Sequence, residues 1–241
     1  MTLIGCDVTL PVMLEAFADE IWIADGPVVA TAGFNYPTRM AIIRLSNGSL
    51  FVWSPTALSP DLRAEVDALG PVRYIVAPNS LHHMFMGDWV SAYPDARLFA
   101  APRLRQKRPD LTFHADLTDA PDCGWSGEID QVVVRGNWIT TEVVFFHRKS
   151  GTVIFTDLLQ QFSGTWFRGW RAMIARLDLM TQPEAEAPRK FRIAFFNRQA
   201  ARIAIRRILN WPAQNILMAH GEPVTLARSD YLALRFRWLR A

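Results

Sequence analysis

Two adjacent histidines stand in the stretch Ala77-Pro78-Asn79-Ser80-Leu81-His82-His83-Met84-Phe85-Met86-Gly87-Asp88-Trp89. The apolar residues at 73–77, just before it, have the composition of a buried strand. Two later stretches share this arrangement, because the run at 152–156 leads to Asp157 and the run at 216–219 leads to His220. In layered α/β folds, ligands and metals bind beyond the carboxyl ends of strands. We therefore expect the histidine pair, Asp157 and His220 to line one site.

Around this stretch, the order of elements predicts an α/β fold. Ser59 is a suitable N-cap, Pro60 stands at the first position of a helix, and Gly70 follows its last turn. The elements expected here are helices at 60–69 and 81–93, a helix or turn at 102–108, and strands at 73–77 and 97–101. Their alternation over 59–101 indicates parallel strands.

On both sides of this part the pattern favours antiparallel strands. Asn47-Gly48 separates strand-like runs at 39–45 and 50–53, which predicts a hairpin with a type I′ turn. Near the N-terminus, Asp25-Gly26-Pro27 predicts a turn between two short strands. Further strands are expected at 129–134, 142–146 and 152–155, with a polar hairpin turn at 147–151.

The C-terminal part is expected to be mainly helical. Residues 189–209 fit one helix, with Phe196 and Ile203 on its inner face. A last helix is expected at 225–240. The aromatic residues within 162–170 could line or cover an apolar pocket.

Size and composition limit the class of protein. With 241 residues, of which 50% are hydrophobic, and a net charge of +3, the chain is expected to form one domain spanning residues 1–241. No apolar run reaches the roughly 18 residues of a membrane span. The two cysteines, Cys6 and Cys123, are far apart, so we expect neither a disulfide framework nor a cysteine zinc site. These features favour a reducing compartment, and we predict a cytoplasmic location.

Basic residues outnumber acidic ones from 189 to 241, and Arg198, Arg202 and Arg206 repeat at four-residue spacing. A solvated helical face explains this pattern, and a surface for nucleic acid or anionic lipid is the alternative. Because aromatic residues do not alternate with basic ones in a known binding motif, we do not expect nucleic acid as a partner. The sequence does not give the oligomeric state.

Several motifs, taken in order, resemble the metallo-β-lactamase fold. The hairpin at 42–53, the strand and loop at 73–88, the hairpin at 142–156 ending in Asp157, and Met218-Ala219-His220-Gly221 resemble successive parts of that family. The pieces that more narrowly resemble its DUF4336 branch are Arg39-Met40, His82-His83 with Gly87 and Trp89, Glu142-Val143-Val144-Phe145-Phe146-His147, and Thr156-Asp157-Leu158. The resemblance implies a four-layer αββα sandwich, in which helices flank two mixed β-sheets and a metal site lies at one edge.

The sequence departs from the ligand set that this resemblance implies. When the family's HxHxDH motif is placed on this chain, Asn79 and Leu81 occupy the first two histidine positions and His83 the aspartate position. Sliding the motif by one residue puts His82 at the second histidine position. The residues that remain for a reduced site, holding one zinc or iron ion, are His82, His83, Asp157 and His220. The alternative is that no metal binds.

Each of these residues also has a structural interpretation. Adjacent side chains point in different directions, so usually only one of His82 and His83 can enter a given site. The alternative is that one histidine bonds to the backbone and the other is exposed. A buried carboxylate at Asp157 needs a partner, which could be a metal, Arg39 or the NH groups of its own turn. His220 could equally be a structural histidine with satisfied hydrogen bonds.

Additional candidates for the site are Asn79, Asp88 and Glu142. Glu142 begins a strand near the expected site and could be an unconventional ligand. For Asp88 the alternative is a solvated helix residue. We expect His147 at a hairpin turn away from the site and His114 in a loop.

The function favoured by these observations is metal-dependent hydrolysis of a small-molecule ester, thioester or phosphoester. The resemblance implies hydrolase ancestry, but the sequence identifies no catalytic residue. The alternative is a member of the fold that has lost its metal and serves as a small-molecule binding or interaction protein.

Overall fold

The computed structural model describes residues 13–226 and 230–239, which form two β-sheets. Cys6 lies outside the described residues, and Cys123 is an exposed free thiol. The seven-stranded sheet has the order β1 (Glu15–Ala18), β2 (Ile21–Thr31), β3 (Phe34–Arg44), β4 (Leu50–Trp53), β5 (Val72–Ala77), β6 (Arg97–Ala100) and β7 (Ala115–Asp116). Its first four strands are antiparallel and β4 to β7 are parallel, as the sequence predicts for residues 59–101.

The five-stranded sheet is mixed. Its strands, in spatial order, are β12 (Val224–Thr225), β11 (Asn215–Met218), β10 (Thr152–Phe155), β9 (Glu142–His147) and β8 (Ile129–Val134). β8, β9 and β10 are antiparallel, whereas β10 and β11 run parallel. The antiparallel pairing of β8, β9 and β10 confirms the strands predicted there.

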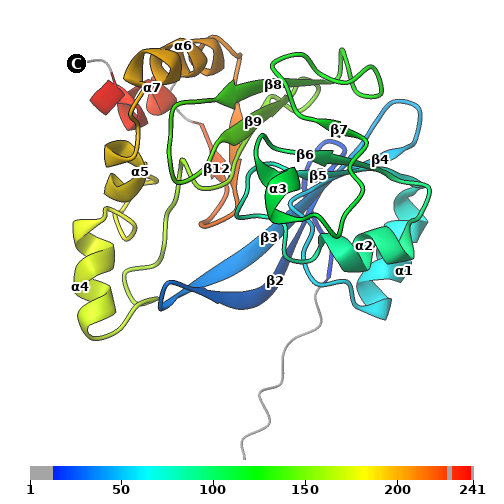
Figure 1. Cartoon of the computed structure of the whole chain (residues 1–241), viewed down its shortest axis with the longest axis horizontal. Helices are drawn as coiled ribbons and strands as arrows, with labels where there is room; N and C mark the ends of the chain where they lie inside the picture. Colours follow the sequence, from blue (N-terminus) through cyan, green and yellow to red (C-terminus); the bar gives the residue numbers. More distant parts are fainter. Residues whose placement is uncertain (1–12, 227–229, 240–241) are drawn as a thin grey trace, which may run out of the picture.

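The two sheets pack face to face, and helices cover their outer faces (Figure 1). Along β9, Val143 and Phe145 belong to the core between the sheets, while Val144 and Phe146 belong to the core under the outer helices. Because alternate residues of a strand point to opposite faces, a strand buried on both sides must be apolar throughout. This explains the continuous apolar runs of the central strands.

The helices divide between the two outer faces. They are α1 (Pro60–Leu69), α2 (Met86–Ala92), α3 (Leu104–Lys107), α4 (Trp170–Leu177), α5 (Arg189–Ile193), α6 (Arg198–Leu209), α7 (Tyr231–Arg235) and the 3-10 helix η1 (Arg237–Leu239). Leu62 of α1 and Trp89 of α2 pack on the seven-stranded sheet. Phe191 of α5 and Ile205 of α6 pack on the five-stranded sheet. The layers are therefore helix, sheet, sheet and helix, and the predicted four-layer αββα sandwich is confirmed.

The hairpin around Asn47-Gly48 forms, but its turn differs from the prediction. Gly48 N donates to Leu45 O at 2.8 Å, and Leu45 N donates to Ser49 O at 2.9 Å. Gly48 has a φ of 82°, whereas Asn47 has no positive φ. This is a three-residue loop with glycine in the left-handed region. Such loops, like type I′ turns, commonly connect the strands of a β-hairpin.

The predicted turn at Asp25-Gly26-Pro27 is wrong, because β2 continues through it. The pairing of β2 with β3 shifts register between Gly26 and Val29, so the segment is a bulge. A side chain at Gly26 would overlap Thr56, and Pro27 O accepts a hydrogen bond from Thr38 Oγ1 at 2.8 Å. Glycine and proline thus mark a bulge in a long strand here.

The helix predicted at 189–209 is divided into α5 and α6. Asn197 caps α6 with its side-chain oxygen, which accepts a hydrogen bond from Ala200 N at 3.0 Å. Phe196 lies in the break between the two helices and is 75% exposed, and Ile203 of α6 is 55% exposed. The expectation that they face inward on one continuous helix is therefore wrong. The buried residues of α6 are Ala201, Ala204, Ile205 and Ile208.

Two other predicted helices are shorter than expected. The helix expected at 81–93 begins at Met86, because the side chain of Asn79 holds the preceding residues in a turn. In place of the helix predicted at 225–240, the described residues form β12, α7 and η1.

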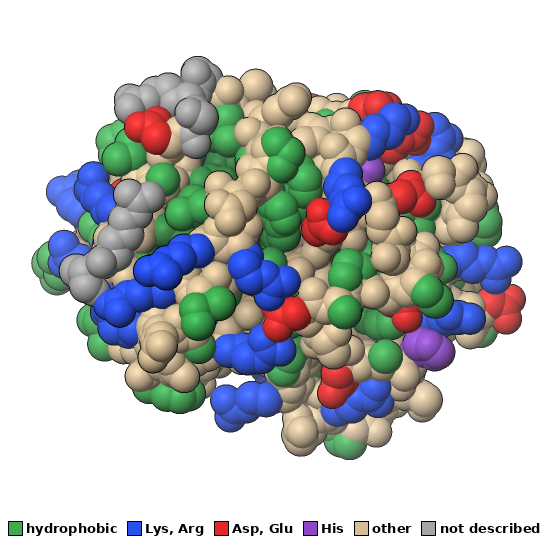
Figure 2. Space-filling view, turned by 90° about the horizontal axis from the view of Figure 1, so that it is seen from above, with side chains coloured by type: hydrophobic (Ala, Val, Ile, Leu, Met, Phe, Trp, Pro, Cys, Tyr) green, Lys and Arg blue, Asp and Glu red, His purple; other side chains and the backbone are tan. Residues whose placement is uncertain are grey.

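Two arginines of α6, Arg198 and Arg202, donate hydrogen bonds to the C-terminal segment. Arg198 Nη2 donates to Trp238 O at 2.6 Å, and Arg202 Nε donates to Leu239 O at 2.5 Å. Figure 2 views the side on which α6 lies and shows Lys and Arg side chains interspersed with acidic and hydrophobic ones.

Candidate functional site

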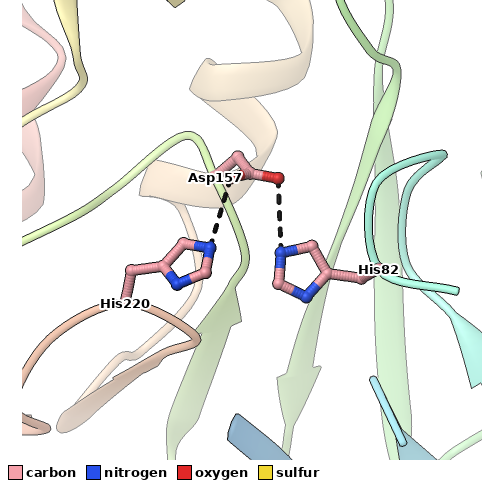
Figure 3. Close-up of side chains that lie close together, drawn as sticks. All are labelled: His82, Asp157 and His220. Carbon is pink, nitrogen blue, oxygen red and sulfur yellow. Dashed lines mark ion pairs between the residues drawn. The ribbon is translucent and has the colours of Figure 1, made fainter. Parts of the chain in front are cut away.

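The site lies where strands from both sheets end. His82 follows β5, Asp157 follows β10, and His220 follows β11. Because β10 and β11 are parallel, their carboxyl ends meet at one edge. Val143 N donates to Pro78 O at 2.8 Å, which joins the two sheets at this edge. Figure 3 shows both imidazole rings directed at the carboxylate between them.

His82 is held by a turn and by a serine. Asn79 Oδ1 accepts hydrogen bonds from Leu81 N at 2.8 Å and His82 N at 2.9 Å, which shapes the loop after β5. His82 Nδ1 lies 2.9 Å from Ser54 Oγ. Its Nε2 lies 3.4 Å from Asp157 Oδ2. One ring nitrogen is thus fixed by protein contacts while the other faces the site.

Asp157 is placed by a second, fully buried carboxylate. Glu142 Oε1 accepts a hydrogen bond from Thr156 N at 2.8 Å, and Oε2 accepts from Asp157 N at 2.8 Å and Leu158 N at 3.0 Å. Burial, and then the charge of Asp157, raise the pKa of Glu142 to about 7. Glu142 therefore organises the turn that carries Asp157, and its oxygens point to that backbone.

The Asp157 side chain receives two amide donors in addition to the imidazoles. Asn79 Nδ2 donates to Oδ2 at 2.7 Å, and Gln160 Nε2 donates to Oδ1 at 3.0 Å. Burial would raise the pKa of Asp157, but the charges and hydrogen bonds of His82 and His220 outweigh it and hold this pKa well below its usual range. The carboxylate is accordingly ionised and strongly oriented.

His220 is enclosed by aromatic rings. Its ring centroid lies 5.4 Å from that of Tyr36 and 5.8 Å from that of Phe162. Its Nδ1 lies 2.9 Å from Pro37 O, and its Nε2 lies 3.4 Å from Asp157 Oδ1. Burial lowers the pKa of His220 and so favours the neutral ring, although Asp157 acts in the opposite direction.

Arg39 supports the loop of His220 and does not pair with Asp157. Its guanidinium forms an ion pair with Asp25, with Nε 2.6 Å from Oδ1. It also donates to the carbonyls of Met218 and Gly221, on either side of His220. The partners expected for Asp157 were a metal, Arg39 or the NH groups of its own turn. Arg39 binds Asp25 and two carbonyls instead, and the NH groups bind Glu142.

Replacement of Gly221 by alanine is expected to destabilise the protein by about 2 kcal/mol, because the backbone there is one that only glycine adopts easily. Gly221 has a φ of 146°, and a Cβ would lie 2.7 Å from Gln161 O. Urea unfolding of Gly221→Ala and of the control Gly164→Ala, where a Cβ meets no atom within 4 Å, measures the difference. Equal stability of the two variants would contradict this prediction.

The donor set fits a small cation. His220 Nδ1 faces a carbonyl, which can only accept, so Nδ1 carries a proton and Nε2 is the ring nitrogen that faces Asp157, 3.4 Å from Oδ1. One ligand atom from each of His82, Asp157 and His220 lies within 4.8 Å of the others. Two imidazole nitrogens and a carboxylate oxygen suit zinc or iron with positions left open. Among residues 13–226 and 230–239, no other group of three such residues comes together.

The remaining candidates lie outside this group. His83 lies near Arg108, whose Nη1 donates to His83 O at 2.7 Å, and burial together with Lys107 and Arg108 lowers the pKa of His83 to about 4. Asp88 is exposed on α2. His147 is buried at the far end of β9, with Nδ1 2.8 Å from Ser150 Oγ.

Ser54, Pro37 and Gln160 have contacts in the site that the sequence did not suggest. Ser54 has a φ of 51° and directly follows β4. A non-glycine residue with positive φ is uncommon and often marks a functional position. No sequence signal shows such a conformation at a serine, so this contact becomes visible only in the fold.

A pocket of about 320 Å³ opens beside the site. Its wall includes His82, Asp157 and His220, and most of its surface is apolar. The other side chains of the wall come chiefly from the β2–β3 hairpin, the loop at 81–85 and α5, and include Val29, Tyr36, Leu81, Phe85, Ile139 and Phe191. Lys107 and Lys190 also reach it. An apolar cavity with a few convergent polar groups is typical of small-molecule sites.

A sequence comparison identifies the family. The family model described as "Domain of unknown function (DUF4336)" matches residues 18–167. The chain belongs to the DUF4336 family. This confirms the narrower resemblance carried by Arg39-Met40, His82-His83 and Thr156-Asp157-Leu158. A comparison with curated proteins found no match.

Solved structures place this DUF4336 protein in the metallo-β-lactamase fold. A metallo-beta-lactamase from Pontibacter korlensis is 11% identical, with a TM-score of 0.62 over 95% of this chain and 99% of its own. The metallo-beta-lactamase FIM-1 from Pseudomonas aeruginosa, in a mono-zinc form, is 14% identical, with a TM-score of 0.63 over 96% of each chain.

A third similar structure comes from another class of protein. The metal-soaked Flv1 flavodiiron core from Synechocystis is 11% identical, with a TM-score of 0.65 over 95% of this chain and 61% of its own. At such identities the likeness establishes the fold alone. No helix among the described residues is long and apolar enough to cross a membrane.

Proposed function

We propose that the chain is a metal-dependent hydrolase in which His82, Asp157 and His220 hold one zinc or iron ion. The observation that carries this proposal is the pairing of Nε2 of His220 with Asp157. The hydrogen bond to Pro37 O commits Nδ1 as a donor, so Nε2 is the ring nitrogen left to bind an ion, and it lies 3.4 Å from Oδ1 of Asp157. With Nε2 of His82 3.4 Å from Oδ2 of the same carboxylate, three possible ligand atoms lie within 4.8 Å of one another.

The contacts behind the ring nitrogens support the same proposal. Metal-binding histidines usually donate their second ring nitrogen to an oxygen of the protein, which fixes the tautomer. Pro37 O takes this place behind His220, and Ser54 Oγ takes it behind His82. Two proteins of similar structure, the mono-zinc form of a metallo-beta-lactamase and a metal-soaked flavodiiron core, were studied with metal, which supports a metal-binding role for this fold.

A bound ion would polarise a carbonyl or phosphoryl oxygen and make water a stronger acid. Asn79 and Gln160 hold the two oxygens of Asp157 in place through their amide groups. The apolar pocket excludes water and binds the hydrocarbon part of a substrate. Lys107 and Lys190 give this wall positive charge, which suits a substrate that also carries an anionic group. An ester, thioester or phosphoester of this kind is the substrate class we propose.

Metal content and hydrolysis together test the proposal. Protein purified without chelator is expected to carry about one zinc or iron ion per chain. It should hydrolyse 4-nitrophenyl acyl esters, lose this activity with a chelator and regain it with added metal. If added zinc does not bind saturably, the metal site is wrong. If zinc binds but no acyl ester, thioester or phosphoester is cleaved, hydrolysis is wrong and the metal site stands.

A second candidate is a small-molecule binding protein without metal. The observation that favours it is the pair of amide donors on Asp157, since Asn79 and Gln160 already satisfy both carboxylate oxygens. The 320 Å³ pocket would then be the functional element. A small molecule retained in native mass spectra of metal-free protein would favour this candidate. We further propose that residues 1–241 form one domain and that the protein is cytoplasmic.

A further inference from the structure

The helix α4 turns its apolar stripe outward. Trp170, Met173, Ile174 and Leu177 follow the spacing of one helix face and are 54%, 61%, 40% and 59% exposed. In a globular protein such a stripe normally faces the core. Ala175 is the buried residue of this helix. The orientation of α4 is therefore the reverse of that of an ordinary covering helix.

The apolar surface continues beyond α4. A hollow of about 480 Å³ lies between α4, α5 and the turn of β2 and β3, and Ile174, Leu177 and Ile193 line it. Ile193 is 81% exposed. Figure 1 shows α4 beside this turn, and the ring of Trp170 lies 5.9 Å from that of Phe34. We name the exposed residues Trp170, Met173, Ile174, Leu177 and Ile193 the α4 patch.

The exposed charged side chains closest in sequence to α4 are basic. Arg168, Arg171, Arg176 and Arg189 are exposed beside it, and residues 161–177 contain no Asp or Glu. Asp178 is half-buried, and its Oδ2 lies 3.5 Å from Lys190 Nζ. Arg171 stacks over Trp170 at 4.7 Å and donates to Gly33 O at 2.6 Å. The arginines therefore form a basic rim around an apolar centre.

We propose that the α4 patch docks on the surface of an anionic lipid bilayer. An amphipathic helix with tryptophan and aliphatic side chains on one face and arginines at its flanks is suited to lie in the membrane interface. Guanidinium groups bind lipid phosphates well. A second copy of this chain fits less well, because a symmetric contact through the patch would bring arginines of both copies together.

The patch also adjoins the candidate active site. Ala32, Tyr36 and Lys190 line both the hollow under α4 and the pocket that contains His82 and His220. The α4 patch therefore lies next to the apolar pocket, so docking on a bilayer would bring the candidate active site close to the acyl chains of the lipids. Any use of this proximity in catalysis rests on the proposed function, whereas docking of the patch on a bilayer does not.

Vesicle sedimentation tests the docking. The protein is expected to pellet with vesicles of phosphatidylcholine and phosphatidylglycerol and to stay in solution with phosphatidylcholine alone. Met173→Glu and Leu177→Glu should each lower binding to the vesicles on the order of 10-fold, because each puts a charge on the helix face that would lie in the bilayer. Both residues are more than half exposed, so the variants should fold. Ile203→Glu, on an apolar residue of α6 that is 55% exposed, is the matched control and should bind as the parent does.

Several results would overturn this proposal. They are binding to neither kind of vesicle, equal binding of Met173→Glu and the parent, and a dimer that Met173→Glu dissociates. Vesicle binding needs no catalysis, so the two proposals can fail separately. If the protein bound vesicles but neither bound metal nor hydrolysed esters, the proposed function would be wrong and the docking proposal would stand.

Discussion

His220→Ala is expected to lower the affinity for zinc by on the order of 100-fold or more, because loss of a group that merely supports a ligand already costs about 10–100-fold. The variant removes Nε2, which lies 3.4 Å from Asp157 Oδ1, and leaves two of the three ligand atoms. Binding of metal to the folded state raises the unfolding temperature. Zinc should therefore raise the unfolding temperature of the parent and leave that of His220→Ala almost unchanged.

His114→Ala is the matched control, because His114 is exposed and contacts Phe99 away from the site. It should keep both the metal content and the zinc-induced stabilisation of the parent. His220 is 4% exposed, and its loss could disturb the fold by itself. His82→Ala, at a more exposed position, removes the ligand on the opposite side and should give the same loss. Retention of zinc by both variants would show that the metal binds elsewhere.

Much of the architecture could be predicted, because the apolar runs mark the buried strands and the residues that interrupt these runs mark where the elements end. The sequence predicts α1 from Ser59, Pro60 and Gly70, and the structure confirms its bounds. Continuous apolar runs predicted the central strands, since both faces of these strands are buried. Two of the errors occurred where one residue's side chain redirects the backbone, as Asn79 does before α2 and Asn197 before α6.

The site was only partly predictable, for a related reason. Asp157 and His220 each follow a buried strand, so their place at the sheet edge could be inferred from order alone. Which of His82 and His83 faces them depends on the turn made by Asn79, which the sequence does not determine. The contact of Ser54 with His82 joins residues in separate elements and depends on a positive φ, so it follows from the fold.

Glu142→Ala is expected to destabilise the protein by about 3 kcal/mol or more, because each buried polar group left without a partner costs about 1–3 kcal/mol. Glu142 is 1% exposed and accepts hydrogen bonds from Thr156 N, Asp157 N and Leu158 N. Alanine would leave these three NH groups in a cavity without an acceptor. Urea unfolding, monitored by circular dichroism, measures the change.

Glu128→Ala is a suitable control for this loss, because Glu128 also accepts a backbone hydrogen bond, from Ser46 N at 2.7 Å, but at the surface. Water can replace that acceptor, so we expect a loss of less than about 1 kcal/mol. Glu142→Gln keeps one carbonyl acceptor and should fall between the two. If Glu142→Ala were no less stable than Glu128→Ala, the turn that carries Asp157 would hold its shape without Glu142. The orientation of Asp157 would then depend on Asn79 and Gln160, whose amides contact the carboxylate directly.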